Sequence, residues 1–566
     1  MSEIHLKIND LEVTAQSGQT VLEAAKGAGV EIPVLCHHPA LSNWGACRMC
    51  VVEVEGMRTL QTACTLPAAD GMVVKTHTEH TFDIRKFVLE LLFSERNHYC
   101  MYCQMSGDCE LQDQAYKHGL DHWTYPRPYE KQEVDATRKY FIMDHNRCIL
   151  CSRCVRACAD IAANHTLGLR NRGAATMISA DLNVPFGESS CVECGTCLQV
   201  CPTGALIDAR SAYGGREKDV THTPTTCMQC SVGCDLDVVT RYNRLLRVDG
   251  VWDSEPSGGL LCVDGRFTPL YETRKRVVKP LVRKDGKLTE SSWDEALGLV
   301  ADTLKGSTCQ GLAACATTNE ALAAFAGLMA QLGGQMGRLE PVAPALGYGA
   351  PAKVADVLDA DFIIVAGAQP LEYQRVVGYF IHRAADKGAT VAVITDSANA
   401  LSKRAALTVA SAQAAVVAKA AADAKKIVLV YSVGMKPEVI ATLKPLGDKV
   451  HFLALDPARN SKGAQAVGLK PQSLVKSDVA YFLLGEQPVD DTLKSPAGFK
   501  VVQAAYHSPL TEQADVVLPT PLWYERTGHV TTLDGVVKPL QAVLPAPADV
   551  RDESVVLAQL AALLTV

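Results

Sequence analysis

The sequence predicts an α+β protein of several domains, in which small cysteine-rich domains precede one larger α/β domain. Nineteen of its 21 cysteines lie before residue 263, and only Cys309 and Cys315 follow. From about residue 300 onward, short aliphatic runs alternate with alanine-rich stretches, a pattern typical of a mostly parallel, doubly wound sheet. We therefore expect the first half to fold around groups held by cysteine and the second half around a hydrophobic core.

The cysteines of the first half fall into five groups whose spacing is typical of iron–sulfur ligands. The groups, in chain order, are Cys36, Cys47, Cys50 and Cys64; Cys100, Cys103 and Cys109; Cys148, Cys151, Cys154 and Cys158; Cys191, Cys194, Cys197 and Cys201; and Cys227, Cys230, Cys234 and Cys262. Five clusters with four protein ligands each need one ligand more than nineteen thiolates supply. Only the second group is short, so we expect a non-cysteine ligand there.

Disulfide bonds and zinc sites are the two alternatives for so many cysteines. Disulfide frameworks belong to small secreted proteins, whereas this chain has 566 residues, and residues 1–30 lack the pattern of a secretory signal. Zinc also binds paired cysteines in tetrahedral sets of four. The run Cys-x2-Cys-x2-Cys-x3-Cys favours clusters, because it is the spacing of bacterial ferredoxins.

Composition argues against two classes of function. The chain is 48% hydrophobic and 21% charged, with a formal net charge of -7, which predicts no surface for nucleic acid. One of its most apolar stretches, Leu312–Gly337, is interrupted by polar residues, and no uncharged apolar run reaches the roughly 18 residues that a membrane span needs. We expect membrane contact only through partner proteins.

Residues 1–78 are predicted to form a β-grasp, ferredoxin-like [2Fe-2S] domain. Alternating apolar residues on both sides of Asn9–Asp10 predict a hairpin, and Thr20 is placed to cap the helix that follows. The loop Cys36–Cys50 then wraps the cluster. Its first gap of ten residues differs from the four residues of plant-type ferredoxins, which indicates a variant of that site.

Residues 79–135 are predicted to hold the group of three cysteines. Apolar residues at intervals of three and four predict a helix over Thr81–Phe93; they are Ile84, Phe87, Val88, Leu91 and Leu92. His98 is the candidate for the missing ligand, because a neutral imidazole can replace cysteine at iron and His98 lies two residues before Cys100. The alternatives are His118, His122 and Asp108.

Residues 136–215 contain two copies of the bacterial ferredoxin run. In such pairs, the fourth cysteine of each run ligates the cluster of the other run. The expected ligand sets are therefore crossed: Cys148, Cys151 and Cys154 with Cys201, and Cys191, Cys194 and Cys197 with Cys158. Two separate, uncrossed sites are the alternative.

Residues 216–275 are predicted to form a small β domain around the fifth cluster, a [4Fe-4S] site. Cys262 follows Cys234 only after 27 residues. This gap has room for strands at Val238–Val239 and Leu245–Val248, which would fold Cys262 back onto the first three cysteines of its group.

The order of these motifs resembles the large iron–sulfur subunit of NADH:quinone oxidoreductase, known as its G-type subunit, and the related subunits of NAD-linked formate dehydrogenases and hydrogenases. The resemblance is carried by the cysteine groups and by the segments Cys262–Phe267, Lys279–Arg283 and Trp293–Leu297, and more loosely by Ala514–Pro519 and Glu525–Gly535. It departs at one position: the family usually has its histidine ligand where this chain has Arg96. The choice of His98 therefore rests on its proximity to Cys100.

The resemblance implies a cytoplasmic electron-transfer subunit with one [2Fe-2S] and four [4Fe-4S] clusters. Its expected partners are a flavin-bearing NAD(P)H dehydrogenase subunit, a small [2Fe-2S] subunit and a second redox, hydrogenase or formate dehydrogenase-type subunit. We expect no nucleotide site in this chain, because Gly347-x-Gly349 follows no predicted strand. Gly367–Pro370 is better placed, after the first predicted strand, and a strand-to-loop turn is the alternative for it.

Residues 276–566 are predicted to form a shortened, degenerate molybdopterin-oxidoreductase-like α/β domain that binds no molybdopterin and serves as a docking scaffold. Six aliphatic runs are its expected strands: Phe362–Val365, Val391–Ile394, Ile427–Val430, Phe452–Leu455, Tyr481–Leu484 and Lys500–Gln503. Its only thiols, Cys309 and Cys315, lie in an alanine-rich stretch typical of buried, inert cysteine. Related formate dehydrogenases have lysine where this chain has Asp264, and a negative charge there argues against an anionic cofactor. A catalytic molybdenum or tungsten domain is the alternative.

Overall fold

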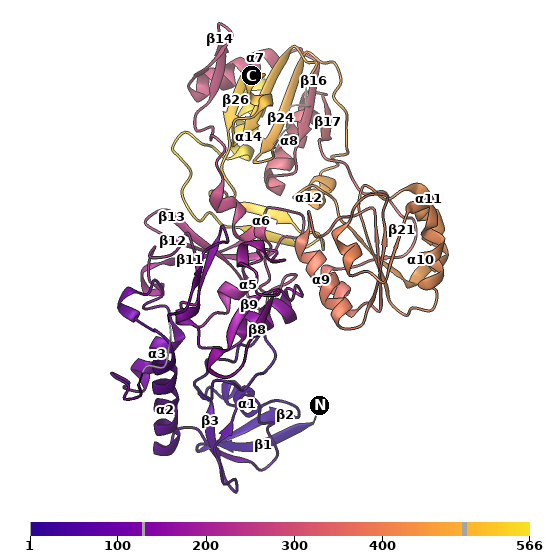
Figure 1. Cartoon of the computed structure of the whole chain (residues 1–566). Helices are drawn as coiled ribbons and strands as arrows, with labels where there is room; N and C mark the ends of the chain where they lie inside the picture. Colours follow the sequence, from indigo (N-terminus) through magenta and orange to yellow (C-terminus); the bar gives the residue numbers. More distant parts are fainter. Residues whose placement is uncertain (1, 127–130, 489–494, 566) are drawn as a thin grey trace. The chain divides into compact units, whose positions relative to one another are not determined.

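The chain, in a computed structural model, is described over residues 2–126, 131–488 and 495–565, and it divides into two compact units, Met1–Thr221 and His222–Val566 (Figure 1). The first unit holds four of the five cysteine groups, and the second unit holds the fifth. Each unit has its own sheets and its own core, so each is described by itself.

A five-stranded sheet with one helix begins the first unit. Its order is β2-β1-β5-β3-β4. The elements are β1 (Glu3–Ile8), β2 (Leu11–Gln16), α1 (Val21–Gly27), β3 (Val51–Val54), β4 (Gln61–Thr62) and β5 (Val73–Lys75). The predicted hairpin is confirmed, because β1 and β2 pair antiparallel around a turn in which Asn9 has a φ of 55°. Thr20 caps α1 as predicted: its hydroxyl accepts the Glu23 amide N–H at 3.2 Å, and the Glu23 carboxylate accepts the Thr20 N–H at 2.7 Å.

Helix α2 (Glu79–Glu95) confirms the predicted helix but not its predicted apolar face. Phe87 and Leu91, two of the predicted inward positions, are 43% and 41% exposed. Arg85 is buried instead, and its guanidinium donates to the carbonyl oxygens of Val51 at 2.7 Å and Thr76 at 2.9 Å. A buried charge must be hydrogen-bonded, so the face of α2 that carries Arg85 turns toward these carbonyl groups.

Short elements and long loops carry the other cysteines of the first unit. The helices are α3 (Glu110–Lys117), α4 (Arg153–Arg156), a π-helical turn over Ala157–Ile161 and α5 (Thr196–Gln199). The strands form one sheet of order β10-β7-β6 and one hairpin of β8 and β9: β6 (Val134–Asp135), β7 (Phe141–Asp144), β8 (Leu167–Arg170), β9 (Met177–Ala180) and β10 (Leu206–Asp208). Loops of this length allow side chains to converge on a common point from several directions.

A three-stranded antiparallel sheet lies at the start of the second unit. It consists of β11 (Thr221–Thr226), which begins at the unit boundary, β12 (Asp235–Arg241) and β13 (Arg244–Gly250). The strands predicted between Cys234 and Cys262 are confirmed as β12 and β13. Helix α6 (Val263–Arg266) directly follows Cys262.

The rest of the second unit contains two large sheets, and the prediction of a single sheet was wrong. All six predicted strands exist, but four belong to a six-stranded parallel sheet of order β18-β23-β22-β19-β20-β21, and two belong to a seven-stranded sheet of order β15-β14-β26-β25-β24-β16-β17. The chain leaves the seven-stranded sheet after β17, builds the six-stranded sheet, and returns with β24. Aliphatic runs identify strands but not their pairing, which is why the sequence did not reveal this division.

The strands of the seven-stranded sheet are β14 (Leu281–Lys284), β15 (Lys287–Glu290), β16 (Cys309–Ala313), β17 (Gln335–Arg338), β24 (Val479–Gly485), β25 (Phe499–Ala504) and β26 (Val516–Pro519). Those of the six-stranded sheet are β18 (Ala350–Pro351), β19 (Phe362–Ala366), β20 (Thr390–Ile394), β21 (Leu407–Val409), β22 (Ile427–Tyr431) and β23 (Val450–Ala454). A separate hairpin is formed by β27 (Gly528–Thr531) and β28 (Val537–Leu540).

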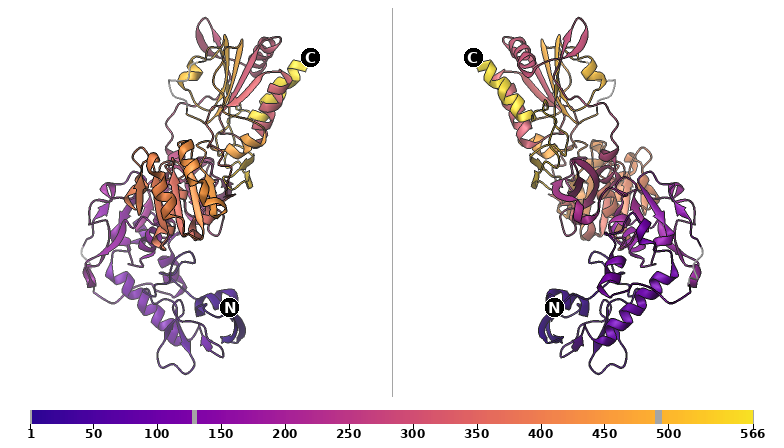
Figure 2. Two further views of the ribbon diagram at one scale, coloured as in Figure 1. Left: turned by 90° about the vertical axis from the view of Figure 1, so that its right-hand side faces the viewer. Right: turned by 90° about the vertical axis from the view of Figure 1, so that its left-hand side faces the viewer.

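Helices pack against both sheets. The last helix, α14 (Glu553–Thr565), lies beside α7 (Trp293–Leu304) and α8 (Asn319–Gln331) at the seven-stranded sheet (Figure 2). Their buried side chains join those of the strands in one hydrophobic cluster. The other helices are α9 (Arg375–Asp386), α10 (Ala414–Ala420), α11 (Pro437–Leu443), α12 (Ser461–Ala466) and α13 (Pro509–Glu512). In the part of the chain that the structure describes, no helix has the length and apolar character needed to cross a bilayer.

Candidate functional site

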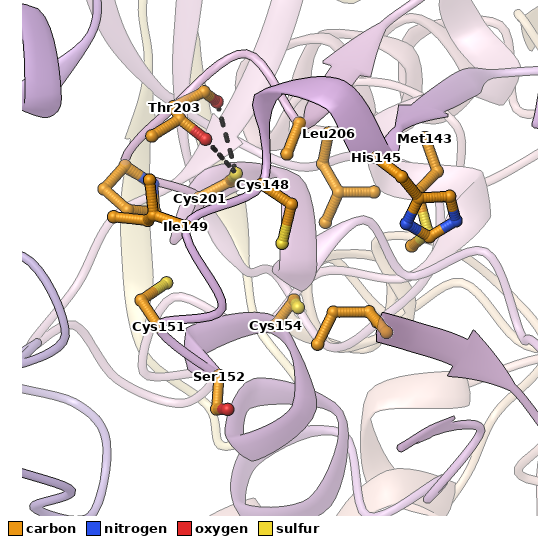
Figure 3. Close-up of a pocket in the computed structure, with 13 residues that line it drawn as sticks. Met143, His145, Cys148, Ile149, Cys151, Ser152, Cys154, Cys201, Thr203 and Leu206 are labelled. Atoms are coloured by element: carbon orange, nitrogen blue, oxygen red, sulfur yellow. Dashed lines mark hydrogen bonds between the residues drawn. The ribbon is translucent and has the colours of Figure 1, made fainter. Parts of the chain in front are cut away.

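Four cysteines from the two ferredoxin-like runs line one cavity of the first unit (Figure 3). Cys148, Cys151 and Cys154 approach it from the first run, and Cys201 approaches it from the end of the second run. Apolar side chains complete most of the wall. The structure thus brings together the crossed set that the sequence predicts, and Cys158 does not line this cavity.

Cys158 lies with the second run instead. Burial, followed by repulsion from Cys194, Cys191, Cys158 and Cys201, raises the pKa of the Cys197 thiol well above its ordinary value. The π-helical turn that contains Cys158 packs against α5, which contains Cys197. The structure thus places Cys158 beside the second run, and the second crossed ligand set stays a prediction.

The loops of the two runs have matching backbone conformations. Two positions in each loop are left-handed, with φ values of 54° and 58° at Leu150 and Ser152, and 54° and 70° at Glu193 and Gly195. Residues other than glycine seldom adopt this conformation. In each loop, the amide two residues after the first cysteine donates to that sulfur at 3.4 Å: Leu150 to Cys148, and Glu193 to Cys191. The turns therefore direct N–H groups at sulfur, an arrangement that stabilises thiolate ligands.

The group of three cysteines lines a second cavity of this unit, together with His98. The Nε2 atom of His98 is buried and has no hydrogen-bond partner. Burial, and then the positive charges of Arg147 and Arg96, lower the pKa of His98 to about 3, so the imidazole is neutral near pH 7. A buried polar atom without a partner is rare, and a metal ligand is a role that fits this one.

The other contenders for this ligand lie elsewhere. His118 is hydrogen-bonded through Nδ1 to the Gln114 carbonyl oxygen at 2.9 Å, and His122 is exposed. Neither they nor Asp108 are among the described residues that line the cavity of His98. Arg96, at the position where the related family has histidine, is buried and donates to backbone carbonyl groups, so its role is structural.

Thr203 lies in the walls of both cavities. Its hydroxyl donates to the Arg147 carbonyl oxygen at 2.8 Å, and the Arg147 side chain also lines the cavity of His98. At the neighbouring Gly204, a Cβ atom would lie 2.7 Å from Cys103 Sγ, so only glycine fits. Sequence reasoning missed this shared wall, because threonine and glycine carry no ligand-spacing signal of their own.

The four cysteines of the first group meet beside the five-stranded sheet. Cys36, Cys50 and Cys64 are almost fully buried, and the Cys47 amide donates to Cys36 Sγ at 3.5 Å. Hydrogen bonds from the Cys47 and Cys64 side chains lower the pKa of the Cys36 thiol. Gly45 supplies the left-handed turn of this loop, with φ 71°.

The fifth group gathers in the second unit, around the start of β12 and α6. Cys227 and Cys230 line a cavity, and burial followed by repulsion from Cys227, Cys230 and Cys262 raises the pKa of Cys234 well above its ordinary value. Cys227 and Cys262 also face the same glycine, because a Cβ on Gly265 would lie 3.3 Å from one sulfur and 4.0 Å from the other. Over residues 2–126, 131–488 and 495–565, no three His, Cys, Asp or Glu side chains form a site for a single metal ion.

The two remaining cysteines are packed in the seven-stranded sheet region. Cys309 lies in β16, and burial raises its pKa to about 12. Cys315 is fully buried, and Glu340 accepts both its amide at 3.1 Å and its thiol at 3.5 Å. Both thiols are therefore buried in the protein interior.

Asp264 is not the free negative charge that the sequence suggested. Arg375, at the start of α9, donates to its carboxylate at 2.8 Å. The ion pair offsets the charge of Asp264, so this residue is a weaker argument against an anionic cofactor than the sequence implied.

Gly367 directly follows β19 and has a φ of 58°. A Cβ at this position would lie 2.2 Å from the Gly434 carbonyl carbon.

Five family models match consecutive parts of the chain. They are the 2Fe-2S iron-sulfur cluster binding domain (residues 1–79), the NADH-ubiquinone oxidoreductase-G iron-sulfur binding region (85–123), the NADH-quinone oxidoreductase subunit 3 ferredoxin-like domain (140–207), the molybdopterin oxidoreductase Fe4S4 domain (220–272) and molybdopterin oxidoreductase (276–437 and 414–563). The last model covers half of the chain. The predicted order of iron–sulfur domains followed by a molybdopterin-oxidoreductase-like domain is confirmed.

Individual relatives agree with these matches. A G-type subunit of NADH-quinone oxidoreductase from Rhizobium meliloti is 37% identical over 58% of this chain and 39% of its own length. NADH-quinone oxidoreductase subunit 3 of Thermus thermophilus is 29% identical over 96% of this chain and 80% of its own length. The NADPH-Fe(3+) oxidoreductase subunit alpha of Geobacter sulfurreducens is 34% identical over 53% of this chain and 35% of its own length.

The chain thus spans well under half the length of two of these three relatives. The predicted resemblance is nevertheless confirmed from the first domain to the last, because the matched regions follow the same order along the chain. The chain belongs to the molybdopterin oxidoreductase family and is a homologue of the large iron–sulfur subunits, G-type and subunit 3, of NADH-quinone oxidoreductases.

Proposed function

We propose that this protein is the electron-transfer subunit of a multisubunit NAD(P)H-linked oxidoreductase. Iron–sulfur clusters, when bound, supply one-electron transfer. The observation that carries the proposal is the shared wall at Thr203. This residue lines both the cavity of Cys148, Cys151, Cys154 and Cys201 and the cavity of His98 and its three cysteines. A relay needs such closely spaced sites.

The proposed ligands are the nineteen cysteines of the five groups and His98. We assign one [2Fe-2S] site to the first group in a β-grasp domain and four [4Fe-4S] sites to the others, with the ferredoxin-like pair crossed. Three kinds of observation support a fit: thiols that converge on buried cavities, the unpartnered Nε2 of His98, and the close approach of Gly204 to Cys103 Sγ.

Burial of the thiols has a consequence for assembly. It raises the pKa of Cys148 to about 11 and the pKa of Cys151 to about 12. The thiols of the apoprotein are therefore protonated near pH 7, and binding of a cluster must displace these protons. The surrounding apolar wall then excludes water from the sulfur atoms.

The partners form part of the proposal. We propose a flavin-bearing NAD(P)H dehydrogenase subunit as the electron donor, a small [2Fe-2S] subunit beside it, and a second redox subunit as the acceptor. The homologues named above support this assignment, since their names describe subunits of NADH-quinone and NADPH-Fe(3+) oxidoreductases.

Reconstitution with the donor tests the relay. The chain purified anaerobically should hold about 18 iron atoms, lack flavin and fail to oxidise NADH, and its visible absorbance should bleach rapidly once the flavoprotein and NADH are added. Tightly bound flavin in the isolated chain, or zinc in stoichiometric amount with little iron, would refute the proposal.

A catalytic molybdenum or tungsten domain is the second candidate, and the match of residues 276–563 to molybdopterin oxidoreductase favours it. We propose instead that this domain is a metal-free scaffold. Cys315 is held by Glu340 inside the protein, and Gly367 and Gly434 close the space between the ends of β19 and β22, where the strand order of the six-stranded sheet reverses and ligands of such sheets bind. Molybdenum or tungsten near one atom per purified chain would make the catalytic candidate correct.

A further inference from the structure

The cavity of the fifth cysteine group has a basic side chain in its wall. Arg459 lines it together with Cys227 and Cys230, and lies in the loop between β23 and α12. The sequence did not single out this arginine, because more than 220 residues separate it from the cysteines. The fold brings the two segments together.

The loop of Arg459 contacts the cysteine loop directly, because the Ser231 hydroxyl donates to the Asp456 carbonyl oxygen at 3.5 Å. The neighbouring Asn460 side chain accepts the Thr531 amide at 3.0 Å and donates to the Thr317 carbonyl oxygen at 3.0 Å. On the cysteine side, the Ser231 carbonyl oxygen accepts the Leu533 amide at 2.6 Å. Hydrogen bonds at Asp456 and Asn460 therefore flank Arg459 and hold its loop at the cysteine loop.

The charge of Arg459 is not offset by an ion pair within the described residues. Glu486 is a buried carboxyl group that interacts with Arg459; burial raises the pKa of Glu486, while Arg526 and Arg459 lower it. Asp264, which also acts on Cys227 and Cys230, is paired with Arg375. A half-buried guanidinium without a partner is unfavourable unless an anion lies beside it.

We propose that Arg459, which has no ion-pair partner among the described residues, sets the reduction potential of the fifth cluster by placing a positive charge beside its thiolate ligands. This inference rests on the proposed function, since it requires a cluster on Cys227, Cys230, Cys234 and Cys262. A cluster gains one negative charge when it accepts one electron, here from a chemical reductant. The guanidinium stabilises the reduced form more than the oxidised form and so raises the potential.

A redox titration of the full chain, followed by electron paramagnetic resonance, tests the inference. The fifth signal is first identified by its loss in Cys230→Ala. In Arg459→Gln, the ratio of reduced to oxidised fifth cluster at a fixed potential should fall about tenfold, a shift of about 59 mV to more negative values for a one-electron couple. Arg459→Lys should remain close to the unsubstituted chain, because it keeps the charge.

The matched control is Lys419→Gln, which removes one positive charge from the exposed side of α10. It should leave the potential unchanged. An unchanged potential in Arg459→Gln, or an equal shift in Arg459→Lys, would overturn the inference. If Arg459→Gln loses the fifth signal, assembly at the original potential in Arg459→Lys supports the role of charge, and loss in both variants overturns it. Absence of a fifth signal in the unsubstituted chain would instead contradict the proposed function.

Discussion

The loop of Cys148 and the strand of Cys309 bury their thiols in opposite ways. Cys148 faces a cavity shared with three other cysteines and accepts the Leu150 amide. Cys309 lies in β16 within a hydrophobic cluster of the seven-stranded sheet. Burial raises the pKa of both thiols, to about 11 and about 12. Burial and pKa therefore do not distinguish a ligand from a core residue; convergence of several thiols on a cavity and inward-pointing N–H donors do.

The comparison extends to the sources of stability. In the two ferredoxin-like runs of the first unit, the α-helices α4 and α5 have four residues each, and long loops carry the cysteines. The second unit has a large hydrophobic cluster between helices and sheet, and an ion pair between Arg526 and Glu553 at 3.0 Å in which both side chains are fully buried. We expect the first unit to depend on its clusters and the sheets of the second unit to be independent of them.

Removal of iron should have the largest effect. Chelation under mild denaturing conditions should unfold the segment 136–215, because metal binding contributes folding free energy where no preformed core exists. Hydrogen exchange followed by mass spectrometry should show loss of protection there, while β19, β22, β24 and β25 remain protected. Equal loss of protection in both units would break the comparison.

Substitution of single cysteines sharpens the contrast. Cys201→Ala should abolish the signal of the cluster predicted on Cys148, Cys151 and Cys154, and lower the iron content by about four atoms per chain. Cys309→Ala is the matched control: it should keep all the iron and cost about 1 kcal/mol of stability. Electron paramagnetic resonance spectra and iron analysis of both variants test these expectations. Loss of the Cys191 cluster in Cys201→Ala would favour the uncrossed alternative.

Removal of the imidazole of His98 should alter a single cluster. His98→Ala takes away the proposed ligand, so one [4Fe-4S] signal should disappear or change shape while the other four remain. His122→Ala, at an exposed histidine, should leave all five signals as they are. If both variants give the spectrum of the unsubstituted chain, the fourth ligand lies elsewhere.

The smallest effect on the clusters is expected from a substitution in the second unit that changes its stability alone. Glu553→Gln leaves the charge of Arg526 buried without a counter-charge, which should lower the free energy of unfolding of this unit by about 3–5 kcal/mol. Denaturant unfolding monitored at the seven-stranded sheet measures this change. The iron content should stay the same, and Lys419→Gln should change neither quantity. Loss of iron in Glu553→Gln would show that the sheets and the clusters are coupled.

Local signals in the sequence were sufficient for several features. The hairpin around Asn9, the cap at Thr20 and the strands β12 and β13 follow from short-range rules of periodicity and capping. The cysteine groups were equally visible, because ligands of one cluster lie a few residues apart and the spacing itself carries the information. The face of α2 was not predictable in this way, because the burial of Arg85 depends on carbonyl groups of distant segments.

The sequence by itself determined which cysteines group together and where most strands lie, since both depend on residues close in the chain. Only the tertiary structure decided that the α/β half contains two sheets, that Thr203 lines two cavities, and that Arg459 lies beside the fifth group. The physical reason is the same in each case. Pairing between strands and the walls of a cavity are set by packing between segments far apart in the chain, and no local pattern records which of the possible packings has the lowest free energy.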